Sequence, residues 1–79
     1  MTLPTGNMLK AARALAGLRA AQLATLAKID ASTVSRLEGS GHRAVRGQAG
    51  TVDAVIRVLK TRGVEITEDG VRLTRRPHR

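Results

Sequence analysis

Apolar residues recur along the first part of the chain at the spacing of amphipathic helices. The pattern predicts helices over about residues 8–16, 20–27, 31–38 and 52–62. The apolar stripes that we expect to be buried are Leu9, Ala12, Ala16, Leu23, Ala24, Ala27, Val34, Leu37, Val52, Val55, Ile56 and Leu59. Good N-cap residues precede three of the helices, namely Asn7, Asp30 and Thr51. Glycines stop three of them, at Gly17, Gly39 and Gly63.

After Gly63 the apolar spacing changes to two, which is typical of strands with one buried face. Residues 64–67 and 71–74 form two such runs around Asp69-Gly70, and Asp-Gly is a strong signal for a tight hairpin turn. A two-residue turn there places Ile66 opposite Leu73 and Glu68 opposite Val71. In that register one face of the hairpin carries four apolar side chains, those of Val64, Ile66, Val71 and Leu73.

Residues 23–39, with the sequence LATLAKIDASTVSRLEG, contain two short helices joined by only Lys28-Ile29-Asp30. A small residue midway along the first helix, Ala24, lets the second helix cross it closely. The residues expected to fix that crossing are Leu23, Ala27, Ile29, Val34 and Leu37. The second helix then presents Ser32, Ser35 and Arg36 outward, on a rod that can lie in a DNA major groove about 12 Å wide. The stretch therefore predicts a helix-turn-helix.

Composition limits the partner and the compartment. Fourteen Lys and Arg against six Asp and Glu give a net charge of +8, which favours a polyanion as the partner. Phe, Tyr and Trp are absent, so the stacking platforms of single-strand and RNA binders are missing and duplex DNA is favoured. Cysteine, a membrane-spanning run and a signal peptide are also absent, so we expect a cytoplasmic protein that does not bind membranes.

Chemistry beyond binding is not expected from the residues present. A chain of 79 residues has little room for both a core and an enclosed catalytic cleft. His42 and His78 have no third ligand at metal spacing, so we expect no metal site. Ser, His and Asp occur without a nucleophile elbow or a Gly-rich phosphate loop. We therefore expect no enzyme activity, no cofactor and no small-molecule ligand.

Three stretches together resemble the Cro/cI-type helix-turn-helix family, also called the XRE or lambda-repressor-like family. They are LKAARALAGL at 9–18, the stretch at 23–39, and TVDAVIRVLKTRGVEI at 51–66. The fold expected from pattern and resemblance is mainly α, a four-helix Cro/cI-type helix-turn-helix domain followed by a C-terminal β-hairpin. As a single domain it divides into a flexible arm at 1–7, the helical part at 8–62, the hairpin at 64–74 and a basic tail at 75–79.

The resemblance, together with the basic loop after the third helix, implies a set of DNA contacts. Base contacts fall on Ala31, Ser32, Thr33, Ser35 and Arg36. Phosphate contacts fall on Arg19, Gln22, Lys28, Gly39, Ser40, Arg43 and Arg46. The family also implies a structural ion pair, here between Arg13 and Glu38. The plainer interpretation of these polar residues is a solvated surface.

Two positions depart from the family pattern. Lys28 stands where the family usually has Gly in the turn, so the turn must accept a positive φ at Lys28 or take another shape. Ala20 stands where the family has Gln at the start of the second helix, so the phosphate clamp there is expected from Arg19 or Gln22 instead.

The resemblance implies a sequence-specific regulator of transcription that binds an inverted repeat in duplex DNA as a homodimer and represses a phage or mobile-element promoter. One alternative is an antitoxin that represses its own operon, and another is a non-specific basic protein that coats nucleic acid. The predicted dimer interface is the apolar face of the hairpin, Val64, Ile66, Val71 and Leu73. The alternative is that this face covers the monomer core while the fourth helices pair through Ala54 and Val58.

Overall fold

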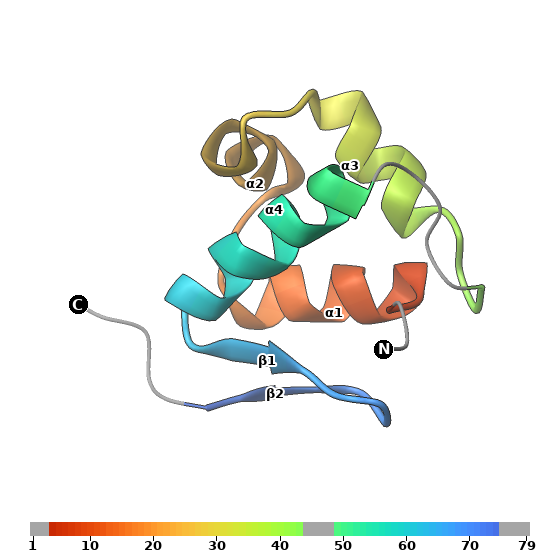
Figure 1. Cartoon of the computed structure of the whole chain (residues 1–79), viewed down its shortest axis with the longest axis vertical. Helices are drawn as coiled ribbons and strands as arrows, with labels where there is room; N and C mark the ends of the chain where they lie inside the picture. The colour runs from red at the N-terminus through yellow and green to blue at the C-terminus, as the bar shows by residue number, and fades with distance from the viewer. Residues whose placement is uncertain (1–3, 44–48, 75–79) are drawn as a thin grey trace.

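The computed structural model describes residues 4–43 and 49–74. Within these residues the chain forms four helices and one antiparallel hairpin, which confirms the predicted fold class (Figure 1). The elements are α1 (Gly6–Leu15), α2 (Ala20–Ala27), α3 (Ala31–Glu38), α4 (Ala49–Thr61), β1 (Val64–Ile66) and β2 (Val71–Leu73). No helix in this part of the chain has the length and apolar character needed to cross a membrane.

The helices and the hairpin enclose one apolar core, in which α2 contacts α3 and α4, α1 contacts α3 and both strands, and α4 contacts β1 (Figure 1). Its buried members are Leu9, Ala12, Ala16, Leu18, Leu23, Ala24, Ala27, Val34, Leu37, Val52, Val55, Leu59 and Val64. The helical stripes predicted to be buried are all found there except Ile56, which is half-buried against the same core. Burial of this apolar surface is the main force that holds these short helices together.

The ends of α2 and α3 agree with the prediction, and Lys28 determines how α2 ends. Lys28 has φ 61° and ψ 45°, which places a non-glycine residue in the left-handed region. Its N–H bonds to the carbonyl of Thr25 at 3.2 Å, and the N–H of Ile29 bonds to that of Ala24 at 2.9 Å. This is the Schellman arrangement, which pairs the last carbonyls of a helix. Lys28 therefore takes the positive φ that the family's Gly would supply.

The starts of α1 and α4 differ from the prediction. The N-cap of α1 is Thr5, whose Oγ1 accepts a hydrogen bond from the N–H of Met8 at 3.1 Å. The predicted cap, Asn7, lies inside the helix. Pro4 is buried, so the flexible arm does not extend to residue 7 as predicted, and residues 1–3 lie outside the described residues. In α4 the helix begins two residues before Thr51, which is therefore not its cap.

The hairpin has a longer turn than predicted. β1 pairs with β2 so that Ile66 faces Val71 and Val64 faces Leu73, which makes the predicted pairing of Ile66 with Leu73 wrong. The two-residue turn expected for Asp-Gly requires a positive φ at both residues, and neither Asp69 nor Gly70 has one.

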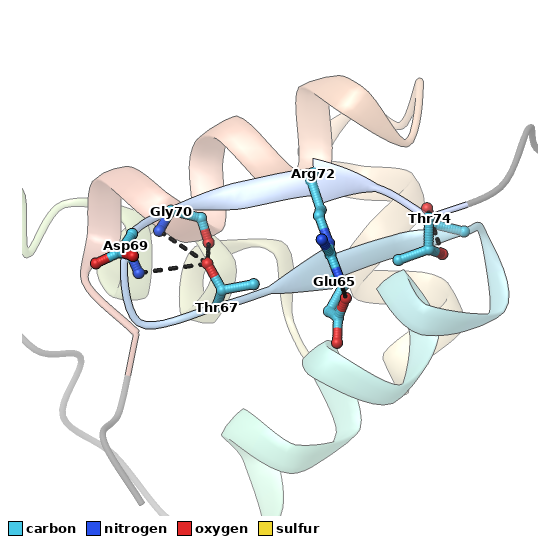
Figure 2. A network of polar contacts seen from close by, with 7 residues as sticks. Glu65, Thr67, Asp69, Gly70, Arg72 and Thr74 are labelled. Carbon is cyan, nitrogen blue, oxygen red and sulfur yellow. Dashed lines mark hydrogen bonds and ion pairs between the residues drawn. The ribbon is translucent and has the colours of Figure 1, made fainter.

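The hydroxyl of Thr67 stabilises the four-residue turn that forms instead (Figure 2). Its Oγ1 accepts hydrogen bonds from the N–H of Asp69 at 3.3 Å and of Gly70 at 3.2 Å. The N–H of Thr67 donates to the carbonyl of Gly70 at 2.7 Å. Because the register differs from the predicted one by two residues, the alternation of faces is unchanged and the four apolar side chains still share one face.

That apolar face packs mainly within the monomer. β1 contacts α1 and α4, and β2 contacts α1. Val64 is only 1% exposed and belongs to the core, whereas Ile66 and Val71 are half-buried against it. Leu73, at 47%, is the member of the set that mainly faces solvent. Two roles were considered for this face, dimerisation and covering the core of the monomer. Val64 has the second role.

Candidate nucleic-acid interface

Helix α3 is held by one side and presents the other to solvent. Val34 and Leu37 are each 2% exposed and pack into the core, where α3 contacts α2 and α1. The predicted base-contact residues on the solvent side are Ala31, Ser32, Ser35 and Arg36, all exposed. Thr33 is half-buried, so less of its side chain is available than the family pattern implies. The result is a rigid helix with a small, polar and basic outer face.

Basic residues lie at both ends of α3. Lys28 and Arg36 line one hollow of about 460 Å³, which Thr51 of α4 and the acidic Asp30 also line. Arg43 is exposed in the loop beyond the other end of the helix. An α-helix with its side chains is about 10–12 Å across, which is close to the width of a major groove. The arrangement therefore places basic residues near both ends of a helix that fits the groove.

The loop residues predicted to contact phosphate are only partly described. Gly39 is exposed and Ser40 is half-buried, at the end of α3. Arg46 lies outside the described residues, so its predicted contact stays a prediction.

The start of α2 carries the other predicted phosphate ligands, Arg19 and Gln22, both exposed. Arg19 is the N-cap, and its N–H donates to Oε1 of Gln22 at 2.8 Å. Since an arginine side chain has no acceptor, this is one half of a capping box. The bond uses the acceptor end of the Gln22 amide and leaves its NH₂ group to donate outward. Gln22 can thus cap the helix and bind a phosphate at the same time.

Arg13 and Glu38 form a bidentate ion pair that joins α1 to the end of α3. Arg13 Nε lies 2.7 Å from Glu38 Oε2 and Nη2 lies 3.0 Å from Oε1, with side-chain exposures of 18% for Arg13 and 10% for Glu38. Hydrogen bonding to Glu38 raises the pKa of Arg13 above its ordinary value, although burial opposes the shift. The pair neutralises an acidic group beside the outer face of α3, where a free carboxylate would repel phosphates.

Several contributing groups were not identified from the sequence. Arg13 Nη1 also donates to the carbonyl of Leu18 at 3.0 Å, which ties the α1–α2 turn into the same network. The carbonyls of Gly41 and Arg43 accept hydrogen bonds from the first turn of α1. Backbone acceptors leave no mark in a single sequence, but the glycine at position 41, with φ 62°, is a signal that the chain turns sharply there.

Comparison with known proteins agrees with this geometry. A family model described as a helix-turn-helix domain matches residues 6–68, which include all four helices and β1. A search of curated proteins gave no significant match. Because the family match covers most of the chain and contains the α2–turn–α3 unit, the protein belongs to the helix-turn-helix domain family.

Proposed function

We propose that the protein is a sequence-specific regulator that binds duplex DNA as a homodimer and represses transcription by occupying an operator. The observation that carries the proposal is the outer face of α3, where small polar residues and Arg36 are exposed on a helix whose other side is fixed in the core. Family membership supports duplex DNA as the ligand. Repression is the simplest outcome of such binding, since a bound operator that overlaps a promoter excludes polymerase.

Base recognition is assigned to the exposed positions of α3. The guanidinium of Arg36 is suited to donate two hydrogen bonds to O6 and N7 of a guanine. The hydroxyls of Ser32 and Ser35 can donate or accept at base edges, and the methyl of Ala31 can pack on a thymine methyl. Thr33 contributes less to base recognition because it is half-buried.

Phosphate binding is assigned to the groups around α3 that carry positive charge or a free donor. Lys28 and Arg43 flank the helix, and Arg19 and Gln22 lie at the start of α2. Such contacts fix the register of a protein on the duplex and carry no sequence information by themselves. Each of them adds a salt-dependent share of the affinity through release of counterions.

Dimerisation is assigned to the outer edge of β2. The N–H of Thr74 donates to the carbonyl of Gly63, and the N–H of Thr67 donates to the carbonyl of Gly70. In the residue pairs 63/74, 65/72 and 67/70 the backbone N–H and C=O groups therefore point toward the other strand of the hairpin. The backbone groups of Val71 and Leu73 therefore point away from β1. Pairing with a second β2 would satisfy this open edge and cover the exposed side chain of Leu73.

Selection of bound fragments from random duplex DNA tests the proposed function. We expect enrichment of an inverted repeat whose half-site centres lie about 34 Å apart, one helical turn, because a two-fold dimer presents two copies of α3. Enrichment of a single half-site would contradict the dimer, and no enriched motif would favour a non-specific basic protein instead.

The dimer itself is tested by Leu73→Lys, followed by light scattering and operator titration. The substitution places a charge at the proposed interface and leaves the core untouched, whereas truncation after residue 63 would also remove the buried Val64. Leu26→Lys is the matched control for light scattering, since Leu26 is 44% exposed on α2. We expect a monomer only for the Leu73 variant. A Leu73 variant that stays dimeric would move the interface to Ala54 and Val58 on α4.

A further inference from the structure

The first turn of α1 is tied to the loop that follows α3 by two backbone hydrogen bonds. The N–H of Gly6 donates to the carbonyl of Arg43 at 3.2 Å, and the N–H of Asn7 donates to that of Gly41 at 2.9 Å. The first N–H groups of a helix have no partner within the helix. The loop supplies acceptors for two of them, so the position of the loop and the start of α1 are coupled (Figure 1).

Gly6 allows this close approach because it has no side chain. A Cβ at position 6 would lie 2.6 Å from the carbonyl oxygen of Glu38 and 2.8 Å from that of Leu37. It would also lie 2.7 Å from the backbone nitrogen of Gly41. These are backbone atoms, which cannot rotate aside as a side chain would. Any other residue at position 6 therefore requires the end of α3 and the loop that follows it to move away from α1.

We propose that Gly6 is a positioning residue for DNA binding, because its close contact fixes the loop at residues 39–43 where Arg43 reaches a phosphate. The inference rests on the proposed function, from which it takes the phosphate contact of Arg43. The side chain of Arg43 is exposed while its carbonyl is held by α1. The backbone is thus ordered before DNA arrives, and a displaced loop would have to be ordered at the cost of affinity.

The pair of Arg13 and Glu38 fixes a neighbouring point of the same segment. Glu38 is the last residue of α3, and its carboxylate is bound by Arg13 in the last turn of α1. Helix α1 therefore holds the end of α3 through a side chain and holds the following loop through its backbone. Only the second of these contacts bears directly on where Arg43 lies.

A double-mutant cycle between Gly6→Ala and Arg43→Ala tests the proposal, with the selected duplex and a range of salt concentrations. Loss of one phosphate contact should weaken binding about eightfold at about 0.1 M salt and lower the salt slope by about one. We expect Gly6→Ala to approach this loss although it removes no charge. In the Gly6→Ala background, Arg43→Ala should then add less than about twofold, since the two changes remove the same contact. Gly70→Ala is the matched control, because a Cβ at Gly70 meets nothing within 4 Å.

A second variant separates positioning from folding. In a chemically synthesised chain, an ester in place of the Thr5–Gly6 amide removes the Gly6 N–H that donates to the carbonyl of Arg43 and adds no atom that clashes. We expect the ester variant to show a circular dichroism spectrum like that of the native chain and a weaker affinity for the duplex. In this variant, as in Gly6→Ala, Arg43→Ala should weaken binding further by less than about twofold. This variant decides the matter if Gly6→Ala does not fold.

The outcomes distinguish this proposal from the proposed function. Full affinity and an unchanged salt slope in a folded Gly6→Ala or ester variant would overturn the role of Gly6. The role would also be overturned if the fold-losses of affinity caused by Gly6→Ala and by Arg43→Ala multiplied in the double variant. A native chain that binds selected and random duplexes alike, by contrast, would overturn the regulator itself.

Discussion

Substitution of Glu38 by Ala should destabilise the fold far more than substitution of an exposed acid. The change removes two charge-assisted hydrogen bonds, at 2.7 and 3.0 Å, and leaves the guanidinium of Arg13 without its counterion. Loss of one member of a fully buried pair costs about 3–5 kcal/mol. Arg13 is 18% exposed and keeps its bond to the carbonyl of Leu18, so water and that carbonyl recover part of the loss. We expect about 2–3 kcal/mol.

Urea unfolding followed by circular dichroism measures this loss, and the hairpin supplies the control. Glu65 pairs with Arg72 at 2.9 Å, but the side-chain exposures there are 41% and 68% (Figure 2). Glu65→Ala should therefore cost less than about 1 kcal/mol. In about 1 M salt the Glu65 effect should disappear while most of the Glu38 effect remains, because a buried pair is screened far less.

Equal small losses for the two Ala variants would refute this reasoning, because the burial of the Arg13–Glu38 pair would then carry no energetic weight. A cycle with Arg13→Ala adds a second criterion. The coupling energy between the two residues should be well above 0.5 kcal/mol, which is roughly the scatter for independent sites.

Two further predictions concern the turn and the DNA contacts. Lys28→Gly should stabilise the protein by about 0.5–1 kcal/mol in the same urea assay. The left-handed backbone costs Lys about 1–2 kcal/mol, and the greater freedom of Gly in the unfolded chain offsets part of the gain. A less stable variant would mean that the Lys28 side chain contributes contacts that outweigh the strain. Arg36→Ala should lose about 1–3 kcal/mol on the selected duplex and relax preference at one base pair, whereas Arg43→Ala should weaken all sequences alike in a filter or anisotropy titration. If both arginine variants weaken every sequence equally, the division into base and phosphate contacts is wrong.

Local sequence signals were sufficient for α2 and α3, whose bounds match the prediction. Asp30 is the N-cap of α3 as predicted, although its side chain makes no capping hydrogen bond, and the broken apolar rhythm at Lys28 lies at the end of α2. The start of α1 is different. Thr5 and Asn7 are both good N-cap residues. Which of them caps α1 depends on the N–H groups of Gly6 and Asn7, because these bond to a loop more than thirty residues away in the sequence. Contacts of that kind cannot be inferred from local propensity.

The hairpin shows the same division between pattern and detail. Alternation correctly placed four apolar side chains on one face, but Asp69-Gly70 indicated a shorter turn than Thr67 stabilises. The ion pair between Glu65 and Arg72 was missed for this reason, since the predicted register sets Glu65 opposite Thr74. For the site, the pairing of Arg13 with Glu38 could be named only through the family resemblance. The close contact of Gly6 had no signal beyond the glycine itself.

The most direct test of the central claim is the ratio of affinities for the selected operator and for a scrambled duplex of the same length, measured at one salt concentration. Sequence readout by the exposed face of α3 predicts an operator affinity at least about a thousandfold higher, which is the lower end for specific regulators. A ratio near one would contradict the account, because binding would then come from the net charge of +8 alone.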